Sequence, residues 1–395
     1  MISVAEARAI LLAQVRRTEA EELSLEACLG RTLAAPVIAT RAQPPFRASA
    51  MDGYAVRSAD TPGRLTLVGE AGAGHTLHKQ LRNGECARIF TGAPLPEGAD
   101  AVAIQEEVTR DGATVTVPAI SAHKHVRTPG VDFSAGALLL ESGVKLSGIE
   151  LAITAAAGKN TLSVARRPCV TILGGGDEIV APGADVRSDQ IFDSASFGVA
   201  GLAQAWGAAA SRGPILRDDA DQIASTIEAT SAASDLVVLI GGASVGDHDH
   251  ARRAIESLGA KVIFDKVSLR PGKPTWFALH RDQLILGLPG NPGSSLVTAR
   301  LFLCPLITMM LGGDSAATTR TRRARLTEPL RANGPREAYL RAKSHVDEQG
   351  TLYVTPASNQ DSSLVSPFAA ADALVVGPAN SEARRPGELV EILSI

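Results

Sequence analysis

Aromatic residues are scarce in this chain, since phenylalanine, tryptophan and tyrosine together make up 4% of its 395 residues. The hydrophobic cores must therefore be built mainly from alanine, valine, leucine and isoleucine. Charge of either sign is not in excess either, because the net charge is −3 at pH 7. A protein that wraps nucleic acid needs a basic surface, so this balance argues against a nucleic-acid partner.

Cysteine is sparse and scattered. The four cysteines are Cys28, Cys86, Cys169 and Cys304, and no two of them form a C-x-x-C pair. This spacing offers neither a zinc site nor a disulfide framework, and it predicts a reducing compartment, the cytoplasm. We interpret all four as small buried apolar side chains rather than as nucleophiles.

Long hydrophobic runs are lacking as well. The longest apolar stretch, residues 296–311, is interrupted by Arg300 and Pro305. Such a run is too short and too broken to span a bilayer. Near the N-terminus, Glu6 and Arg8 lie where a signal peptide would need an unbroken apolar region. We therefore expect neither a membrane partner nor a secretory signal.

The texture of the sequence changes along the chain and predicts four domains. Residues 1–43 and 138–166 form a discontinuous N-terminal helical and linking domain, into which a β-rich domain of residues 44–137 is inserted. Residues 167–313 alternate apolar strands with helices, which predicts an α/β domain on a parallel sheet covered on both faces. Residues 314–395 carry a β pattern and form a small C-terminal β domain. The fold class is thus α/β plus β-rich domains.

Three glycine-rich turns lie in the α/β region, at residues 173–178, 240–249 and 288–295, and each follows an apolar run and precedes a helical pattern. This geometry presents backbone N–H groups to an anion at the positive end of a helix dipole. A single turn of this kind is also an ordinary use of glycine for positive φ. Because parallel strands end at one edge of a sheet, we expect the three turns to share a site for a phosphorylated ligand.

Carboxylates accompany two of these turns. Asp177 and Glu178 lie on the first, and Asp247 and Asp249 begin the helix after the second. Carboxylates at these positions act as helix caps in any protein. They also hold Mg²⁺ beside bound phosphates, with one or two protein oxygens. The sequence leaves both interpretations open.

A run of cations follows at residues 266–274 (KVSLRPGKP), with Lys266, Arg270 and Lys273 around a Pro-Gly pair. A solvated face is the ordinary fate of such a run. Here a rigid turn follows an apolar strand, so the three charges are also placed to line one wall of an oxyanion pocket.

The β-rich region contributes two further segments. Asp52 lies between Met51 and Gly53, and Thr91 ends an apolar run. Either residue can be explained as part of a turn that satisfies local N–H groups. The sequence contains no serine nucleophile elbow, so a hydrolase built on a serine triad is disfavoured.

Eight motifs follow one another along the chain: PPFRASAMDGYAV (44–56), RIFTGAPLPEGADAV (88–102), RTPGVDFSAG (127–136), GGDEIVAPG (175–183), SDQIFDS (188–194), GGASVGDHD (241–249), RPGKP (270–274) and LPGNPGSS (288–295). In this order they resemble the molybdopterin molybdenumtransferases, the MoeA-type enzymes whose animal counterpart is the gephyrin E domain. The resemblance runs from about Val4 to Ile395.

The resemblance implies an enzyme with two substrates, adenylylated molybdopterin and molybdate. It inserts the metal into the dithiolene and releases AMP with help from Mg²⁺. The resemblance also implies an elongated four-domain subunit in a homodimer, with a site between the α/β domain of one subunit and the N- and C-terminal parts of the other. An upstream adenylyltransferase and downstream molybdoenzymes are further implied partners.

Individual positions match functional positions of the family. Catalytic positions match Asp52, Thr91, Glu178, Asp218, Asp249, Lys266 and Lys273, with Glu178 and Asp249 around the metal ion. Positions that bind substrate or molybdate match Gly175, Asp177, Gly241, Gly242, Ser244, Arg270, Pro289, Gly290, Asn291, Ser294, Arg341 and Ser362. From this match we expect Lys273, Arg270, Arg341 and Ser362 to hold molybdate or the substrate phosphate, since a doubly charged oxyanion needs several fixed donors.

The chain departs from the family pattern at several places. Gly174–Gly176 replaces hydroxyl residues, Ile240 stands where serine or threonine often precedes Gly-Gly, and Arg270 stands where lysine is frequent. These departures leave a tungstate-preferring relative open. A catalytically silent scaffold on the same fold is a second alternative, against which the matched charges argue. An adenylyltransferase is a third, against which the extra β-rich regions argue.

Overall fold

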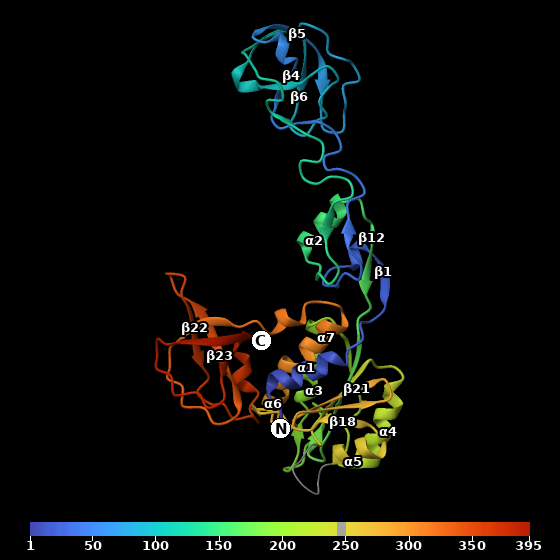
Figure 1. Ribbon diagram of the computed structural model, residues 1–395, viewed down its shortest axis with the longest axis vertical. Coiled ribbons are helices and arrows are strands. Elements are labelled where there is room, and N and C mark those ends of the chain that lie inside the picture. Colours follow the sequence, from blue (N-terminus) through green and yellow to red (C-terminus); the bar gives the residue numbers. More distant parts are fainter. Residues whose placement is uncertain (243–249) are drawn as a thin grey trace.

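The computed structural model describes residues 1–242 and 250–395. The chain forms four units along a long axis, with a distal β-rich unit at one end and an α/β unit at the other (Figure 1). A small middle unit lies between them, and a C-terminal β unit lies beside the α/β unit. This architecture confirms the predicted combination of an α/β domain with N- and C-terminal β-rich modules. Two predicted site residues, Ser244 and Asp249, lie outside the described residues.

The α/β unit is built on a six-stranded sheet. Its strands are β13 (Cys169–Gly174), β16 (Ala209–Arg212), β17 (Leu236–Ile240), β18 (Lys261–Phe264), β20 (Trp276–His280) and β21 (Gln283–Leu288). They lie in the order β16-β13-β17-β21-β20-β18, and the first four are parallel, as predicted. The prediction of a wholly parallel sheet is incomplete. A two-residue turn at Arg281 and Asp282 joins β20 to β21 as a hairpin, so β20 runs antiparallel to both its neighbours.

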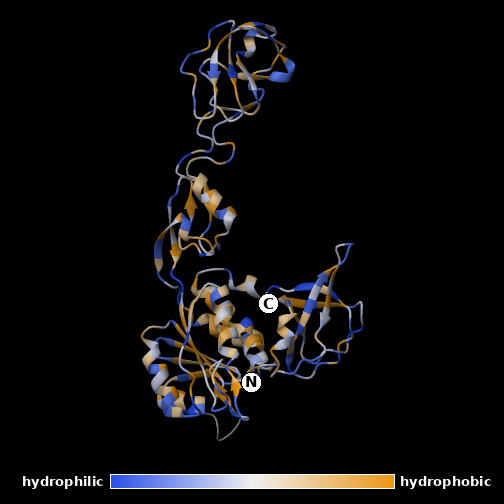
Figure 2. Cartoon of the chain, turned by 180° about the vertical axis from the view of Figure 1, so that it is seen from behind, coloured by the Kyte–Doolittle hydropathy of each residue, from blue (hydrophilic) through white to orange (hydrophobic). Residues whose placement is uncertain are grey.

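Helices cover both faces of this sheet. One face carries α1 (Val4–Ala13), α3 (Ala195–Ala205), and the continuous helical run of α6 (Pro292–Thr298), the π-helix η4 (Ala299–Leu303) and α7 (Cys304–Met310). The other face carries α4 (Ala220–Ser231) and α5 (His250–Ser257). Because side chains alternate along a strand, Val238 of β17 joins the first core and its neighbour Val237 joins the second. Figure 2 shows hydrophobic residues concentrated along these inner strands.

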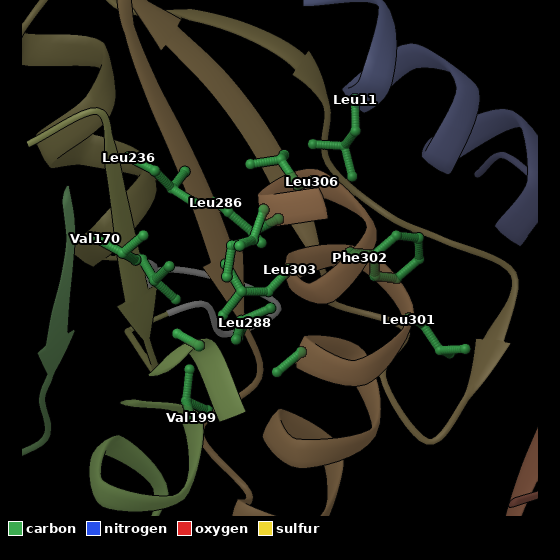
Figure 3. Close-up of a cluster of buried hydrophobic side chains, with 14 of the residues drawn as sticks. Leu11, Val170, Val199, Leu236, Leu286, Leu288, Leu301, Phe302, Leu303 and Leu306 are labelled. Atoms are coloured by element: carbon green, nitrogen blue, oxygen red, sulfur yellow. The ribbon is translucent and has the colours of Figure 1, made fainter. Parts of the chain in front are cut away.

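The N-terminal helix α1 belongs in space to the α/β unit. A capping box of Ser3 and Glu6 begins it. Its buried face packs into the first core, where Leu11 lies beside Leu306 of α7 (Figure 3). The start of the predicted N-terminal domain, residues 1–43, is therefore separated from the rest of that segment, because the apolar face of α1 is covered by α7 and η4.

The helical run Pro292–Met310 is, within the described residues, long and apolar enough to cross a membrane. It exceeds the predicted stretch 296–311 at its N-terminal end, because the helix begins at Pro292. Of its most apolar stretch, 83% is buried within the protein. Packing in the first core accounts for its composition.

The middle unit is small and contains two separate two-stranded sheets. Its elements are β1 (Ala20–Ser24), η1 (Leu25–Ala27), β2 (Val37–Ile38), β11 (Leu138–Leu140), α2 (Gly148–Ala156) and β12 (Thr161–Ala165). β1 pairs antiparallel with β12, and β2 pairs antiparallel with β11. The outgoing and returning chains therefore run side by side between the two ends of the molecule.

The distal unit is a β-rich insertion. Its elements are β3 (Ala48–Ser49), β4 (Gly53–Val56), η2 (Ser58–Asp60), β5 (Gly63–Ala71), β6 (Glu85–Ile89), β7 (Ala101–Ile104), η3 (Gln105–Glu107), β8 (Thr109–Asp111), β9 (Thr114–Val117) and β10 (Val126–Arg127). The main sheet has the order β7-β4-β6-β5-β9-β8. Small side chains such as Ala55 and Ala87 fill its core, as the scarcity of aromatic residues predicts.

The sheet of the C-terminal unit includes a short strand that comes from the cationic run at residues 266–274. Its elements are β19 (Leu269–Arg270), β22 (Arg322–Leu326), β23 (Glu337–Val346), β24 (Leu352–Pro356), η6 (Ser366–Ala369), β25 (Ala373–Gly377) and β26 (Leu389–Ser394), reached from α7 through η5 (Ser315–Thr319). The sheet order is β19-β23-β24-β22-β26-β25, and β23 also pairs with β25. Because β19 pairs with β23 through Leu269 and Glu337, the cationic run is continuous with this sheet. A separate parallel pair, β14 (Ile179–Val180) and β15 (Ile191–Phe192), follows the first glycine turn.

Candidate active site

The three glycine turns meet at the carboxyl ends of β13, β17 and β21. The N–H of Gly175 donates to the carbonyl of Ile240 at 3.2 Å, and the N–H of Gly241 donates to the carbonyl of Leu288 at 3.1 Å. A Cβ on Gly241, whose φ is +86°, would lie 2.9 Å from the carbonyl oxygen of Gly175 and 3.7 Å from Cα of Gly290. The backbones of the three turns are therefore in direct contact, as the parallel strand pattern predicts.

A cleft of about 1960 Å³ opens beside these turns, between the α/β unit and the C-terminal unit. Part of its lining comes from the ends of the strands and part from the turns of the C-terminal sheet. Residues matched to the family that line it are Gly175, Glu178, Arg270, Lys273, Pro289, Gly290, Asn291, Ser294 and Ser362.

Glu178 lies on the first turn, with an exposed side chain. Its carboxylate lies over Gly176, where a Cβ would come within 2.4 Å of Oε2 of Glu178. Gly176 has a φ of +143°, which a residue with a side chain rarely adopts. The positive φ favours glycine at this position, and the absence of a side chain leaves room for the Glu178 carboxylate at the edge of the cleft.

Asp177 and Asp218 lie outside the lining of the cleft. The N–H of Asp177 donates to Asp218 at 3.4 Å, and the N–H of Asp218 donates to Asp177 at the same distance. The N–H of Gly176 also donates to the carbonyl of Leu216 at 3.0 Å. These contacts tie the first glycine turn to the loop before α4. In the single chain, the two aspartates thus act as turn residues.

The cationic run forms an ordered turn. The hydroxyl of Thr275 donates to the carbonyl of Gly272 at 2.7 Å, and the N–H of Val267 donates to the carbonyl of Lys273 at 3.0 Å. Gly272 has a φ of +121°, and a Cβ there would lie 2.4 Å from Cγ2 of Thr298 in α6. The turn is thus pressed against α6.

This packing fixes where the three cations of the run lie. The exposed side chains of Arg270 and Lys273 line the cleft. Lys266 is half-buried and lies outside the lining.

Arg341 lies behind the wall of the cleft, since it is 2% exposed and does not line it. Its guanidinium donates to the carbonyl of Leu364 at 2.8 Å and to the carbonyl of Asp361 at 2.9 Å. The geometry differs from the expected direct contact with an oxyanion, because the backbone carbonyls of this segment occupy the donors. Arg341 instead positions the segment that carries Ser362, whose carbonyl accepts from the N–H of Gly293 at 2.9 Å.

Asp52 and Thr91 lie together in the distal unit. Oδ1 of Asp52 accepts from the N–H of Thr91 at 2.7 Å and from its hydroxyl at 2.8 Å. These hydrogen bonds lower the pKa of the Asp52 carboxyl below its usual range. β4, which begins directly after Asp52, is separated from the α/β unit by the middle unit (Figure 1). The structure therefore brings these two residues together, but not with the cleft of the same chain.

Several lining residues were not among the predicted site residues, although Asp193 lies within the matched motif at residues 188–194. Asp193 is 6% exposed, accepts from the N–H of Ser196 at 3.1 Å and lies 3.7 Å from Arg212. Four arginines of the C-terminal unit also line the cleft: Arg331, Arg336, Arg384 and Arg385. The available signal was the clustering of arginine with glycine and proline in RANGPR (331–336) and SEARRPG (381–387). That pattern identifies turns but not which surface they face.

The described residues contain no group of three or more histidine, cysteine or acidic side chains placed to hold a metal ion. Glu178 nevertheless presents an exposed carboxylate beside the glycine turns. Mg²⁺ is commonly held by one or two carboxylates, with the remaining oxygens from substrate phosphate and water. The donor set at this edge therefore fits Mg²⁺ once a phosphorylated substrate is bound.

The chain matches three family descriptions in sequence. Residues 2–158 match the MoeA N-terminal region (domain I and II), residues 171–309 match a probable molybdopterin binding domain, and residues 323–395 match the MoeA C-terminal region (domain IV). A solved structure of the molybdopterin biosynthesis protein MoeA from Pyrococcus horikoshii superposes with a TM-score of 0.86 at 30% identity, covering 100% of this chain and 99% of that one. A second structure of a MoeA protein from this organism has a TM-score of 0.80 at 24% identity and full coverage of both chains, and shows the same fold.

Curated relatives match over nearly the whole length. A molybdopterin molybdenumtransferase of Nostoc sp. is 34% identical, covering 95% of this chain and 89% of that protein. One of Haemophilus influenzae is 32% identical, covering 95% of this chain and 94% of that protein. One of Bacillus subtilis is 31% identical, covering 96% and 91%. The chain therefore belongs to the molybdopterin molybdenumtransferase family of transferases, which acts in molybdenum cofactor biosynthesis.

Proposed function

We propose that this protein inserts molybdate into adenylylated molybdopterin and releases AMP, giving the molybdenum cofactor. The observation that carries the proposal is the cleft, in which three touching glycine turns face a fixed cationic turn. The positive end of the helix dipole at a strand-to-helix turn suits phosphate, while the N–H groups of Gly175 and Gly241 are used between the turns. Rigid cations suit an oxyanion.

The cationic turn is the candidate molybdate site. The hydrogen bonds of Thr275 and Val267 order the backbone of the turn that carries Arg270 and Lys273, so the backbone needs little reorganisation when a dianion binds. Ser362 adds a hydroxyl on the same cleft. Arg341 acts indirectly, since it fixes the segment that presents Ser362. We assign Lys266 no direct contact.

We propose that Glu178, together with Asp249, would hold Mg²⁺ beside the adenylyl phosphate. When bound, the ion supplies positive charge that lowers the cost of charge developing on the departing AMP. The role of Glu178 is to offer its carboxylate at the cleft edge, supported by the glycine beneath it. A structural role as a helix cap fits Glu178 less well, because the first turn leads into the short strand β14 and the carbonyl of Glu178 accepts from the N–H of Ile191 at 2.8 Å.

We further propose that the protein works as a homodimer in which Asp52 and Thr91 complete the cleft of the partner. Two observations support this proposal. The matched pair lies in the distal unit, far from the cleft of its own chain (Figure 1). The middle unit also exposes large apolar side chains, which suit a self-complementary interface: Leu29 at 62%, Ile38 at 46%, Leu138 at 56% and Ile149 at 71%.

We place this activity in the cytoplasm, with an adenylyltransferase upstream and molybdoenzymes downstream. The cysteine side chains support a reducing compartment, because Cys28, Cys86 and Cys304 are buried as free thiols. Burial raises the pKa of Cys86 to about 11 and that of Cys304 to about 12. Both thiols therefore stay protonated and act as packing groups.

The test is AMP release. Purified protein with adenylylated molybdopterin, Mg²⁺ and molybdate is expected to release AMP and to yield active cofactor. Lack of AMP release would favour a catalytically silent scaffold on the same fold. Replacing molybdate by tungstate in a parallel reaction decides the metal preference, which the loss of hydroxyl residues at Gly174–Gly176 leaves open.

A further inference from the structure

Four arginines on the C-terminal wall of the cleft form a surface that the proposed roles do not use. Arg331 and Arg336 lie on one loop, and Arg384 and Arg385 lie on another. All four line the same cleft as the glycine turns. We call these four residues the arginine platform.

The two loops of the platform are held together by backbone pairing. Leu330 and Arg384 exchange two N–H to carbonyl hydrogen bonds, each of 2.9 Å. The side-chain amide of Asn333 donates to the carbonyls of Arg336 at 2.7 Å and Gly377 at 3.0 Å. The backbone beneath the arginines is therefore ordered before any ligand binds, which lowers the entropic cost of binding.

The platform carries positive charge with little local compensation. Within residues 1–242 and 250–395, Arg331 and Arg385 have no ion pair, and Arg384 has one long contact of 4.0 Å with Glu388. Arg336 donates to the carbonyl of Leu269 at 3.4 Å. Of the described residues, three acids line the cleft: Asp193 is engaged by Ser196, Glu178 lies at the first glycine turn, and Glu328 is exposed three residues before Arg331.

The cleft is large enough to hold more than one anionic group, and Arg336 lies where the platform meets the cationic turn. A volume of about 1960 Å³ is larger than the roughly 300–1,000 Å³ usual for a small-molecule site. One tetrahedral oxyanion at Arg270 and Lys273 fills only part of it. A ligand that contacts the arginines as well as the cationic turn would match their charge with a second anionic group.

We propose that the arginine platform binds a phosphoryl group of the substrate, while the cationic turn binds the separate oxyanion. This inference rests on the proposed function and deepens it. Molybdate and phosphoryl groups are both tetrahedral oxyanions. The platform is assigned to phosphoryl groups because several guanidinium forks can grip the neighbouring oxygens of a diphosphate in a bidentate manner.

The test measures binding without turnover. Isothermal titration calorimetry of the full-length protein uses inorganic pyrophosphate in one series and molybdate in the other. The R384Q/R385Q variant removes two adjacent platform charges. The R322Q/R323Q variant is the matched control, since these adjacent arginines of β22 are exposed in the same unit and lie outside the cleft lining.

We expect R384Q/R385Q to weaken pyrophosphate binding by about tenfold, a loss of about 1.4 kcal/mol, and to leave molybdate binding unchanged. R322Q/R323Q should change neither. K273Q should weaken molybdate binding. Equal weakening of pyrophosphate by both arginine pairs would reduce the effect to net charge and overturn the proposal, as would a loss of molybdate binding alone in R384Q/R385Q.

A second variant distinguishes a loss of pyrophosphate binding from a folding defect. R331Q removes one exposed guanidinium from the other loop and should weaken pyrophosphate binding with an unchanged melting temperature. If R331Q melts normally and binds pyrophosphate as the wild type does, the platform assignment fails. Absence of AMP release with the expected pyrophosphate pattern would instead reject the enzymatic proposal and leave the platform standing.

Discussion

The side-chain amide of Asn291 donates a hydrogen bond of 3.0 Å to the hydroxyl of Ser362. Asn291 is the N-cap residue of α6 in the α/β unit, and Ser362 belongs to the C-terminal unit. Both side chains line the cleft. This contact therefore joins the two walls at the point where α6 begins.

Ser362→Ala should weaken the link between the walls. A single hydrogen bond is worth about 1 kcal/mol, so AMP release is expected to fall by about fivefold. The variant should keep the wild-type melting temperature, because the carbonyl of Ser362 still accepts from Gly293. Ser366→Ala, at the exposed start of η6 outside the cleft lining, is the matched control. Equal rates for both variants would remove Ser362 from the site.

Gly272→Ala should disturb the cationic turn. The new Cβ would meet Thr298 at 2.4 Å in a backbone conformation with a φ of +121°. We expect the free energy of unfolding of the α/β unit to fall by about 1–3 kcal/mol, together with weaker molybdate binding. Calorimetry of the full chain checks the first effect.

Gly201→Ala is the control for that experiment. Gly201 lies inside α3, and a Cβ there meets open space. This substitution should stabilise the protein by about 0.5–1 kcal/mol, since alanine favours a helix interior. A neutral Gly272→Ala beside a stabilising Gly201→Ala would contradict the packing argument.

The contact between Asp52 and Thr91 should make the distal unit sensitive to acid. The lowered pKa of Asp52 means that its carboxylate stabilises the folded state above the unfolded pKa of about 3.9. That contribution is lost as the pH falls through the folded pKa. Asp52→Asn should therefore be less heat-stable than the wild type at pH 7, and the difference should close in acid. Asp132→Asn, an exposed position in the same unit, should show no such trend.

Mixed dimers test whether one cleft uses two chains. Asp52→Asn and Lys273→Gln chains should each be inactive in AMP release as homodimers. Randomly reassembled mixtures should recover about a quarter of the wild-type rate, because half of the dimers are mixed and each of these has one complete cleft. No recovery in verified mixed dimers would place Asp52 and Lys273 in separate functions.

Part of this site was predictable because it follows from local rules. The meeting of Gly175, Gly241 and Gly290 depends only on three adjacent parallel strands, and the apolar runs before the turns indicate those strands. The capping box of Ser3 and Glu6 was equally visible, since it spans only four residues. Features that depend on short sequence separation were thus within reach.

The arginine platform was not predictable in the same way. Its loops meet because Leu330 pairs with Arg384, and no periodicity links these two segments. The burial of Arg341 depends likewise on the carbonyls of residues 359–364, which fold around it. The hairpin of β20 and β21 was not predicted, because both strands are apolar and only Arg281 and Asp282 separate them.

The pairing of β19 with β23 has a mechanical consequence. Arg270 pairs in register with Ala338, so the oxyanion wall is part of the neighbouring sheet rather than packed against it. Gly272 in the same turn packs against Thr298 of α6, so Arg270 is tied both to the C-terminal sheet and to the helix that follows the third glycine turn. The position of the oxyanion wall relative to the glycine turns is therefore set by both units together, and a change in either unit alters the space left for an anion.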